Sequence, residues 1–308
     1  MALTLQQMSV LFSNDPMKQR LITSFLEGSE SVVLPDLYFV DSNEMLGYTF
    51  SQVNDLGDVS ERSLNGQYTI SDAKASPKHI TLALFGGATQ TDNVVIDSKG
   101  ETARLIRIDK RMIAMGKYFD DMFINGDTQA NPRQFTGLRK RSELKNRVLW
   151  TGTNGGPLTL NILDEALDAV SGDNTKKTIY CDRYTRRQIT IAVRGAATGS
   201  NTMEVQTQVQ SYNGARIKTI SENHKFAPVF AANEKRGSAT TCRSLYVTRL
   251  GGSQDEEGVQ GIKGPTFMKL RQPVNMGEFV KDVIDNVLGI EDFGDFAFMR
   301  IGGILAAA

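Results

Sequence analysis

An uninterrupted helical pattern in the middle of the chain constrains the fold more than any other feature. From Glu101 to Ile124 such a helix is about 36 Å long at ~1.5 Å per residue. Its apolar residues recur at spacings of three and four, which places them on one face. They are Leu105, Ile108, Met112, Met115, Phe119 and Met122. A helix of this length with one apolar face must lie across a large apolar surface formed by other parts of the chain.

The residues that follow predict an abrupt helix stop at Asn125, Gly126 and Asp127. Glycine adopts the left-handed conformation that ends many helices, and we expect Gly126 to act in this way. The Asp127 side chain is expected to form a turn. An irregular stretch then leads to Gly137 and Leu138.

This order of patterns resembles the major capsid proteins of tailed bacteriophages, the Hong Kong phage capsid fold family. The resemblance rests on the long helix, the sequence Phe123-Ile124-Asn125-Gly126-Asp127 and the later Gly137-Leu138. It covers most of the chain and includes no catalytic signature. It implies an α+β fold with an N-terminal arm, an extended β-hairpin loop, a peripheral domain built on the long spine helix, and an α/β axial domain.

Changes of pattern divide the chain into five segments, which take the names used for that family. The predicted segments are the N-terminal arm (1–42), the extended loop (43–90), the peripheral domain with the spine helix (91–157), the axial domain (158–266), and C-terminal return strands that complete both domains (267–308). Asn154-Gly155-Gly156-Pro157 marks the boundary before the axial domain.

The first two segments are predicted to be an arm and a projection that depend on other surfaces for burial. In the arm, a helix from Pro16 to about Gly28 is too short to be stable alone and needs a surface on its own domain or on a neighbour. In the loop, Asn65-Gly66 predicts a tight hairpin, Ile80, Leu82 and Leu84 alternate as in a half-buried strand, and Gly86-Gly87 ends the projection. An isolated hairpin is marginally stable in water. The resemblance implies that it lies over an adjacent subunit.

Several shorter predictions concern the axial domain and the return strands. Tyr212 to Ala215 is expected to be a hairpin turn, and Val229 and Phe230 to lie in a strand. The Gly-rich and acidic segment 251–264 predicts a mobile surface loop, and 278–285 a surface segment. The apolar strand 296–301 must be docked, because an exposed apolar terminus is unfavourable.

Composition argues against a dedicated nucleic-acid reader and favours association. The 35 Lys and Arg residues balance 35 Asp and Glu residues, so the formal net charge is zero and long-range repulsion between copies is weak. We expect no membrane span, because no apolar run approaches the ~20 residues required, and no secretory signal. Cys181 and Cys242 are expected to be reduced and structural.

The sequence predicts no catalytic, cofactor or metal site, and therefore no enzyme. His79 and His224 give no metal-ligand spacing. The run 258–264 lacks the Gly-Lys-Ser/Thr ending of a phosphate loop. Asp120, Asp121 and Asp127 lack the alternating oxygen ligands of a calcium loop.

Basic residues are the candidates for function. The first group, Arg104, Arg107 and Arg111, lies beside the apolar stripe of the long helix. They could contact packaged DNA phosphates, or they could pair with carboxylates of a neighbour or remain solvated. The same alternatives apply to two further groups. The second group is Arg139, Lys140 and Arg141 with Lys145 and Arg147, and the third is Arg183, Arg186 and Arg187.

We predict a self-assembling shell protein. The resemblance implies hexamers and pentamers that form an icosahedral virion capsid around double-stranded DNA, assembled in the host cytoplasm with a portal protein. Because the chain begins directly with the arm, we expect either a separate scaffolding protein or a chain already trimmed. Two alternatives stay open: an encapsulin-like nanocompartment, which shares the fold and holds protein cargo, and an α/β enzyme.

Overall fold

The computed structural model describes residues 3–4, 16–26, 31–55, 57–68, 70–72, 74–196, 210–252 and 257–305. The helices are α2 (Pro16–Leu26), α3 (Asn93–Lys99), α4 (Glu101–Asn125), α5 (Leu138–Leu144), α6 (Leu160–Asp168) and α7 (Arg183–Ala196), with a 3₁₀ turn at Asn174–Lys176. The strands are β1 (Leu3–Thr4), β2 (Tyr38–Asp41), β3 (Gly47–Asp55), β4 (Lys74–Thr81), β5 (Ala83–Asp92), β6 (Val148–Trp150), β7 (Lys177–Cys181), β8 (Ser211–Tyr212), β9 (Ala215–Thr219), β10 (Glu234–Arg236), β11 (Ala239–Arg249), β12 (Gly258–Lys263), β13 (Lys269–Leu270), β14 (Val274–Asn275), β15 (Phe279–Phe293) and β16 (Phe298–Ile304).

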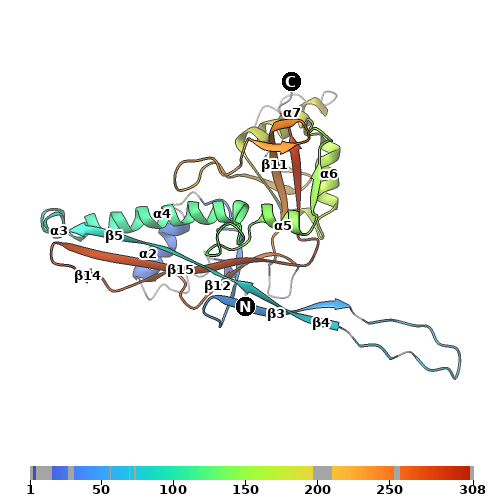
Figure 1. Ribbon diagram of the computed structural model, residues 1–308, viewed down its shortest axis with the longest axis horizontal. Coiled ribbons are helices and arrows are strands. Elements are labelled where there is room, and N and C mark those ends of the chain that lie inside the picture. The colour runs from blue at the N-terminus through green and yellow to red at the C-terminus, as the bar shows by residue number, and fades with distance from the viewer. Residues whose placement is uncertain are drawn as a thin grey trace.

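The strands form separate sheets, and the mixed α+β class is confirmed. One sheet has the order β1-β2-β12-β15, and β5, β13 and β14 also pair with β15. A second has the order β6-β16-β11-β7-β9-β8, with β10 on β11, and β3 pairs only with β4. Figure 1 shows α4 lying along β5 and β15, the second sheet standing with α6 and α7 at one end, and β3 and β4 projecting from the body.

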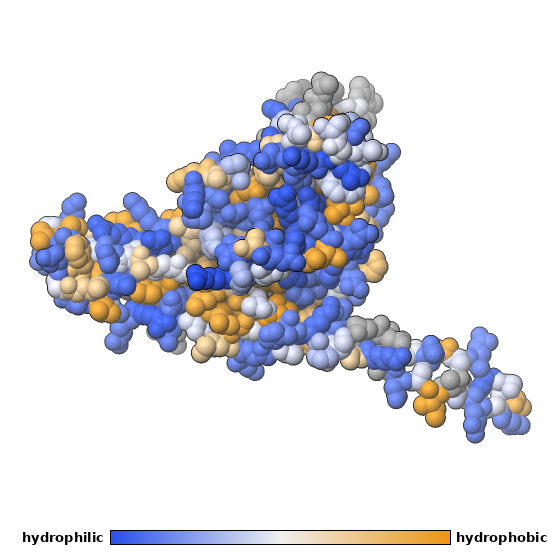
Figure 2. All heavy atoms as spheres, in the orientation of Figure 1, coloured by the Kyte–Doolittle hydropathy of each residue, from blue (hydrophilic) through white to orange (hydrophobic). Residues whose placement is uncertain are grey.

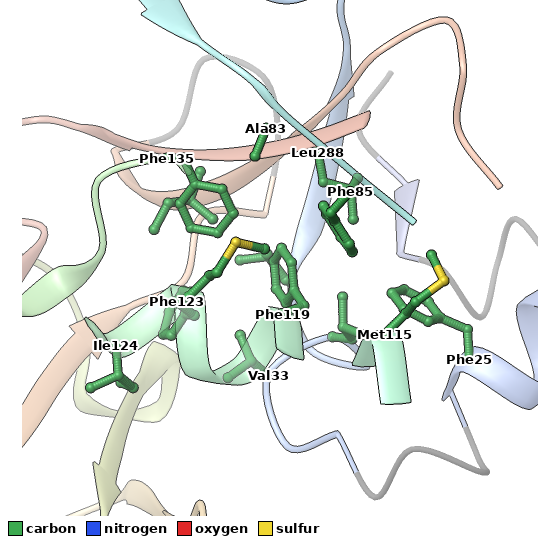
Figure 3. Close-up of a cluster of buried hydrophobic side chains, with 14 of the residues drawn as sticks. Phe25, Val33, Ala83, Phe85, Met115, Phe119, Phe123, Ile124, Phe135 and Leu288 are labelled. Atoms are coloured by element: carbon green, nitrogen blue, oxygen red, sulfur yellow. The ribbon is translucent and has the colours of Figure 1, made fainter. Parts of the chain in front are cut away.

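The long helix α4 covers the first sheet with its apolar stripe. Ile108, Met112, Met115, Phe119 and Met122 are buried, and Leu105 is partly buried against the same core. In Figure 3, Phe119 and Phe123 of the helix lie below Phe85, Leu288 and Phe135, which come from distant segments of the chain. The Phe119 and Phe135 ring centroids are 5.7 Å apart. The helix therefore joins Ala83, Phe85, Phe135 and Leu288 into one core.

The helix stops after Asn125 as predicted, but Gly126 does not adopt the left-handed conformation that was expected to end it. This glycine has φ −54° and ψ 133°, so it is extended and not left-handed. A Cβ added there would stand 2.5 Å from the Met122 carbonyl oxygen and closer still to that of Phe135. Gly126 N donates to Met122 O (2.9 Å) and Gly126 O accepts from Gly137 N (2.8 Å). Glycine is needed because two backbone segments meet here.

Of the two surfaces expected for the helix within residues 1–42, the structure shows the one on its own chain. Leu21, Ile22 and Phe25 of α2 are buried against α4, and so are Val33 and Phe39. β2 pairs in parallel with β12. Gly28, the expected end of the helix, lies outside the described residues. Residues 16–26 and 31–41 are part of the main core because their apolar side chains fill the space beneath the helix.

The extended loop contains the predicted pair of strands with a different tip and base. β3 and β4 are antiparallel, with Tyr48 opposite Ile80, and the intervening stretch of about 18 residues is largely irregular. Asn65 has φ 68° in a local turn that Gly66 N closes on Ser63 O (2.9 Å), but no paired strands flank it. The turn is therefore formed within the loop and does not connect β3 to β4.

At the base of the loop, the predicted ending at Gly86-Gly87 is wrong. β5 runs without interruption through both glycines. A Cβ on Gly87 would stand 2.5 Å from Arg111 Cδ, and one on Gly86 would clash with the Ile284 carbonyl. The alternation also shifts at Leu82, so that Ala83 and Phe85 are buried and Leu84 is exposed.

The second sheet has cores on both faces. In β7, Ile179 and Cys181 belong to the core beneath α6 and α7, whereas Tyr180 belongs to the core of α4. β11 alternates in the same way, with Leu245 and Val247 on one face and Tyr246 on the other. The predicted turn after Tyr212 is confirmed by the positive φ of the two residues that follow it.

Two predictions for the C-terminal part are wrong, and the predicted surface segment 278–285 is buried only in part. Residues 258–263 form the buried strand β12 and not a surface loop, and Gly261 lies so close to the Phe39 ring that a Cβ would not fit. Residues 279–285 lie in β15, where Asp282 is fully buried. Val229 and Phe230 are buried but lie outside any strand. The apolar C-terminal strand is docked as β16 between β6 and β11.

Candidate interaction surfaces

The first basic residue of the long helix is an internal structural group. Arg104 Nε and Nη2 donate to the two carboxylate oxygens of Asp282 at 2.8 and 2.7 Å, and Nη1 donates to Glu101 at 3.0 Å. Asp282 is buried in β15. The guanidinium of Arg104 therefore neutralises a carboxylate of its own chain, and its contact with DNA or a neighbouring subunit stays a prediction.

Arg107 and Arg111 lie at the exposed flank of the same helix, where they border a groove. Arg107 donates to Gln90 O, and Arg111 Nη2 donates to Ala88 O at 3.1 Å. Both bonds reach the backbone of β5. The groove has a volume of about 390 Å³ and is lined by Ala88, Thr89, Gln90, Arg107, Lys110, Arg111 and Ala114. The structure thus brings together two of the basic residues named above, Arg107 and Arg111, and a third, Lys110, which lies off their helical spacing.

The second basic group is tied to carboxylates within the chain. Arg141 bonds Glu291 (2.7 Å), Asp292 and the Ile290 carbonyl (2.7 Å). Lys145 also reaches Asp292. The hypothesis that Arg141 faces DNA or a neighbour is wrong, since these contacts fasten α5 to the end of β15.

The outer members of the second group are less enclosed. Arg139 lies 3.9 Å from Glu234, and Lys140 lies 3.7 Å from Asp127. The Arg147 guanidinium donates to Asp295 O and covers the Phe296 ring at 4.1 Å. Arg139 and Lys140 have these contacts within the chain, and their contact with DNA or a neighbouring subunit stays a prediction.

The acidic residues near the end of α4 make hydrogen bonds within the chain. Asp127 accepts from Gln129 N at 2.8 Å, as expected for a turn. Asp121 accepts from the side-chain amides of Asn125 (2.9 Å) and Asn223 (3.1 Å). Within the residues that the structure describes, no group of three or more His, Cys, Asp or Glu side chains could hold a metal ion.

Asp120 is a buried acid that joins the N-terminal segment to the helix. Its oxygens accept from Ser31 Oγ (2.7 Å) and Val32 N (2.9 Å). Burial raises the pKa of Asp120 to about 7, against the opposing effects of these hydrogen bonds and of Lys218. Its carboxyl group is therefore poised to change charge near neutral pH.

The histidines and cysteines have local roles. His79 Nδ1 lies 3.0 Å from Thr49 Oγ1 across the β3–β4 pair, and the His224 ring packs edge-on against Tyr118. Burial lowers the pKa of His224 and raises the pKa of both Cys181 and Cys242, so these thiols are protonated at neutral pH. The described helices do not combine the length and apolarity needed to cross a membrane.

The most exposed large apolar side chains lie on the projecting loop. Val59, Leu64 and Ile70 are each more than 90% exposed, and Tyr68 is 62% exposed. Figure 2 shows apolar groups on this projection, separate from the body. These residues follow neither the helical nor the strand period, so the sequence gives no regular pattern that marks them as a surface. The feature of the sequence that could have indicated an interaction surface is the presence of isolated apolar residues in an otherwise polar loop.

Comparison with solved structures identifies the architecture. The chain resembles the holo-SrpI encapsulin complex of Synechococcus elongatus (TM-score 0.62, 14% identity, 87% of this chain and 85% of that chain). It also resembles the capsid of a native GTA particle, with a TM-score of 0.59 and 12% identity over 92% of this chain and 91% of that chain. A third similar structure is the procapsid of satellite phage P4, with a TM-score of 0.55 and 12% identity over 94% of this chain and 91% of that chain.

Comparisons of sequence give no such match. No protein-family model matches the chain, and no curated protein matches it significantly. The likeness in structure nevertheless extends over most of the chain and over most of each of the three solved proteins. Two of these three solved structures are a capsid and a procapsid. The chain has the Hong Kong phage capsid fold, which tailed-phage capsids and encapsulins share.

Proposed function

We propose that this chain is the major capsid protein of a tailed bacteriophage. Copies of the chain form hexamers and pentamers, which close into an icosahedral shell around double-stranded DNA. The virion capsid is then the protein's location, after assembly in the host cytoplasm. A portal protein, and a separate scaffolding protein during assembly, are the partners that this proposal implies.

One observation carries the self-assembling role. The fold keeps its body well packed while the loop between β3 and β4 exposes Val59, Leu64 and Ile70 almost completely. Single exposed apolar residues are common, but several on one projecting segment indicate a binding surface. Association between copies removes these side chains from water, at ~25 cal/mol per Å² of apolar area, and the gain is repeated at every subunit of a closed shell.

An encapsulin-like compartment is the second candidate, and the likeness to the SrpI encapsulin complex favours it. In that case the shell holds protein and not DNA. Both candidates require the same closed assembly. They differ in what the interior contains.

Electron microscopy of the purified recombinant chain, alone and with nuclease-treated host extract, tests the proposal. Closed shells of uniform size support the self-assembling role, and a soluble monomer at high concentration contradicts it. Shells isolated from infected or lysogenic cells then decide between the candidates. DNA protected from added nuclease supports a phage capsid, whereas a defined protein cargo without DNA supports a compartment.

A further inference from the structure

We propose that the cleft between residues 35–38 and the second sheet binds a small phosphate monoester of about the size of a mononucleotide. The cleft has a volume of about 400 Å³, which lies within the range of ligand pockets. The N-terminal segment contributes Pro35 and Tyr38 to its lining, and the second sheet with the turn before β7 contributes Arg216 and Lys176. All of these residues belong to one copy of the chain, so the inference goes beyond the proposed shell and does not depend on it.

Strand alternation points Arg216 into this cleft. Ala215 and Ile217 of β9 belong to the core beneath α6 and α7, so Arg216 and Lys218 extend from the opposite face of the sheet. Lys218 is engaged there, because its ammonium group pairs with Asp36 of the N-terminal segment. The exposed guanidinium of Arg216 makes no hydrogen bond or ion pair with the residues that the structure describes. The cleft therefore contains a cation that is available to a ligand.

The charges of the described lining residues favour an anion with two negative charges. Lys176 and Arg216 are cationic, and the carboxylate of Asp36 is already offset by Lys218. A phosphate monoester carries about −1.5 to −2 near pH 7, whereas a carboxylate carries only one charge. Arginine binds phosphate through two parallel N–H bonds, and a hydroxyl such as that of Thr175 can add a further donor.

The rest of the cleft suits the organic part of such a ligand. Its volume is more than ten times the ~30 Å³ that one water molecule occupies in the liquid, so inorganic phosphate alone would fill only a small part of it. Pro35, Tyr38 and Leu250 supply apolar surface. The Tyr38 ring can stack on a flat base, as aromatic side chains do in nucleotide recognition. A phosphate joined to a flat ring therefore fits both parts of the cleft.

Calorimetric titration of the full-length chain with deoxyadenosine monophosphate, inorganic phosphate and deoxyadenosine tests the site. The monophosphate should bind more tightly than inorganic phosphate, and deoxyadenosine at least about tenfold more weakly than the monophosphate, because it lacks the charged group. Affinity for the monophosphate should fall as NaCl is added, since salt screens the exposed cations.

Variants assign the binding to this cleft. Arg216→Ala should weaken binding of the monophosphate by about tenfold or more, equivalent to ~1.4 kcal/mol. Tyr38→Leu should narrow the difference between the monophosphate and inorganic phosphate. Arg133→Ala, at an exposed arginine between α4 and α5, is the matched control and should bind as the unaltered chain does. The monophosphate should raise the Tm of the unaltered chain and not that of Arg216→Ala, because a ligand that binds only the folded chain stabilises it.

A competing 5′-phosphorylated oligonucleotide identifies the source of the phosphate. Displacement of the monophosphate assigns the site to the end of a nucleic-acid strand, and lack of displacement assigns it to a free nucleotide. The proposal is overturned if the monophosphate does not bind at millimolar concentration, if it binds no better than chloride, or if Arg216→Ala binds it unchanged. None of these measurements requires shells, so failure of assembly in the electron microscope bears on the proposed function alone.

Discussion

At the scale of single residues, the buried carboxylates set the most specific expectations. Asp120 has an ordinary pKa of 3.8 and a folded pKa of about 7. The folded chain therefore binds more protons than the unfolded chain between these values, and the stability that depends on Asp120 falls as pH rises through this window. The protonated form is favoured because the side chain is excluded from water.

Ser31→Ala should raise the pKa of Asp120 further, because the lost hydroxyl donates to the charged form. Carboxyl ¹³C NMR titration of the unassembled subunit measures the midpoint. Ser24→Ala is the matched control, since that hydroxyl donates to Asp109 instead. A midpoint for Asp120 near 4 in the unaltered chain would contradict the argument.

The Arg104–Asp282 pair gives a second prediction. Arg104→Ala should lower the free energy of unfolding by about 3–5 kcal/mol, because it leaves Asp282 buried without its partner. Replacing both residues with leucine should cost much less, since no buried charge then remains. Urea unfolding of the unassembled subunit gives both values. Equal losses in the single and double variants would show that packing, and not charge, sets the cost.

At the scale of elements, the end of α4 depends on close backbone contact. Gly126→Ala should destabilise the subunit by about 2 kcal/mol or more, the range of overpacked sites, because the added methyl group meets the Met122 and Phe135 carbonyls. Alanine can adopt the φ of −54° found at Gly126, so the expected loss of stability does not come from a left-handed backbone conformation. Gly100→Ala is the contrasting variant, with φ 72° and open space around it. Chemical denaturation compares the two.

The extended loop is an element whose removal should separate folding from assembly. Replacing 57–72 with Asn-Gly should leave the Tm of the unassembled subunit within a few degrees of wild type, because the apolar side chains of the loop are exposed and outside the core. Shell formation, followed by sedimentation velocity and electron microscopy, should be lost. Shells of normal yield from this variant would remove the loop from the assembly interface.

At the scale of the whole molecule, the two large cores share a sheet. Tyr180 and Tyr246 face the core of α4, while their neighbours Ile179 and Val247 face α6 and α7. The Phe123 and Tyr180 ring centroids are 5.6 Å apart. Loss of either core therefore exposes one face of β7 and β11, which couples the two.

This coupling predicts a single unfolding transition for the unassembled subunit. Calorimetry should give a ratio of calorimetric to van 't Hoff enthalpy near one. Tyr180→Ala should weaken the coupling and broaden the transition, whereas Tyr212→Ala, on the neighbouring hairpin, should not. Two resolved transitions in the unaltered chain would show that the domains unfold independently.

The sequence by itself determined the elements that depend on local periodicity and turn chemistry. The stripe from Leu105 to Met122 required a helix, and Asn213-Gly214 required a tight turn, because residues three or four apart or directly adjacent supply the interactions. The capsid-fold resemblance followed from the order of such elements. Their presence does not depend on which distant segment covers them.

Only the tertiary structure decided which partners each side chain meets. Arg104 pairs with Asp282, 178 residues away, and Arg141 with Glu291, 150 residues away. The same folding placed residues 31–41 in the core and left Lys110 beside an open strand edge. Sequence spacing carries no information on such contacts, because electrostatic pairing and steric fit depend on distance in space and not on distance along the chain.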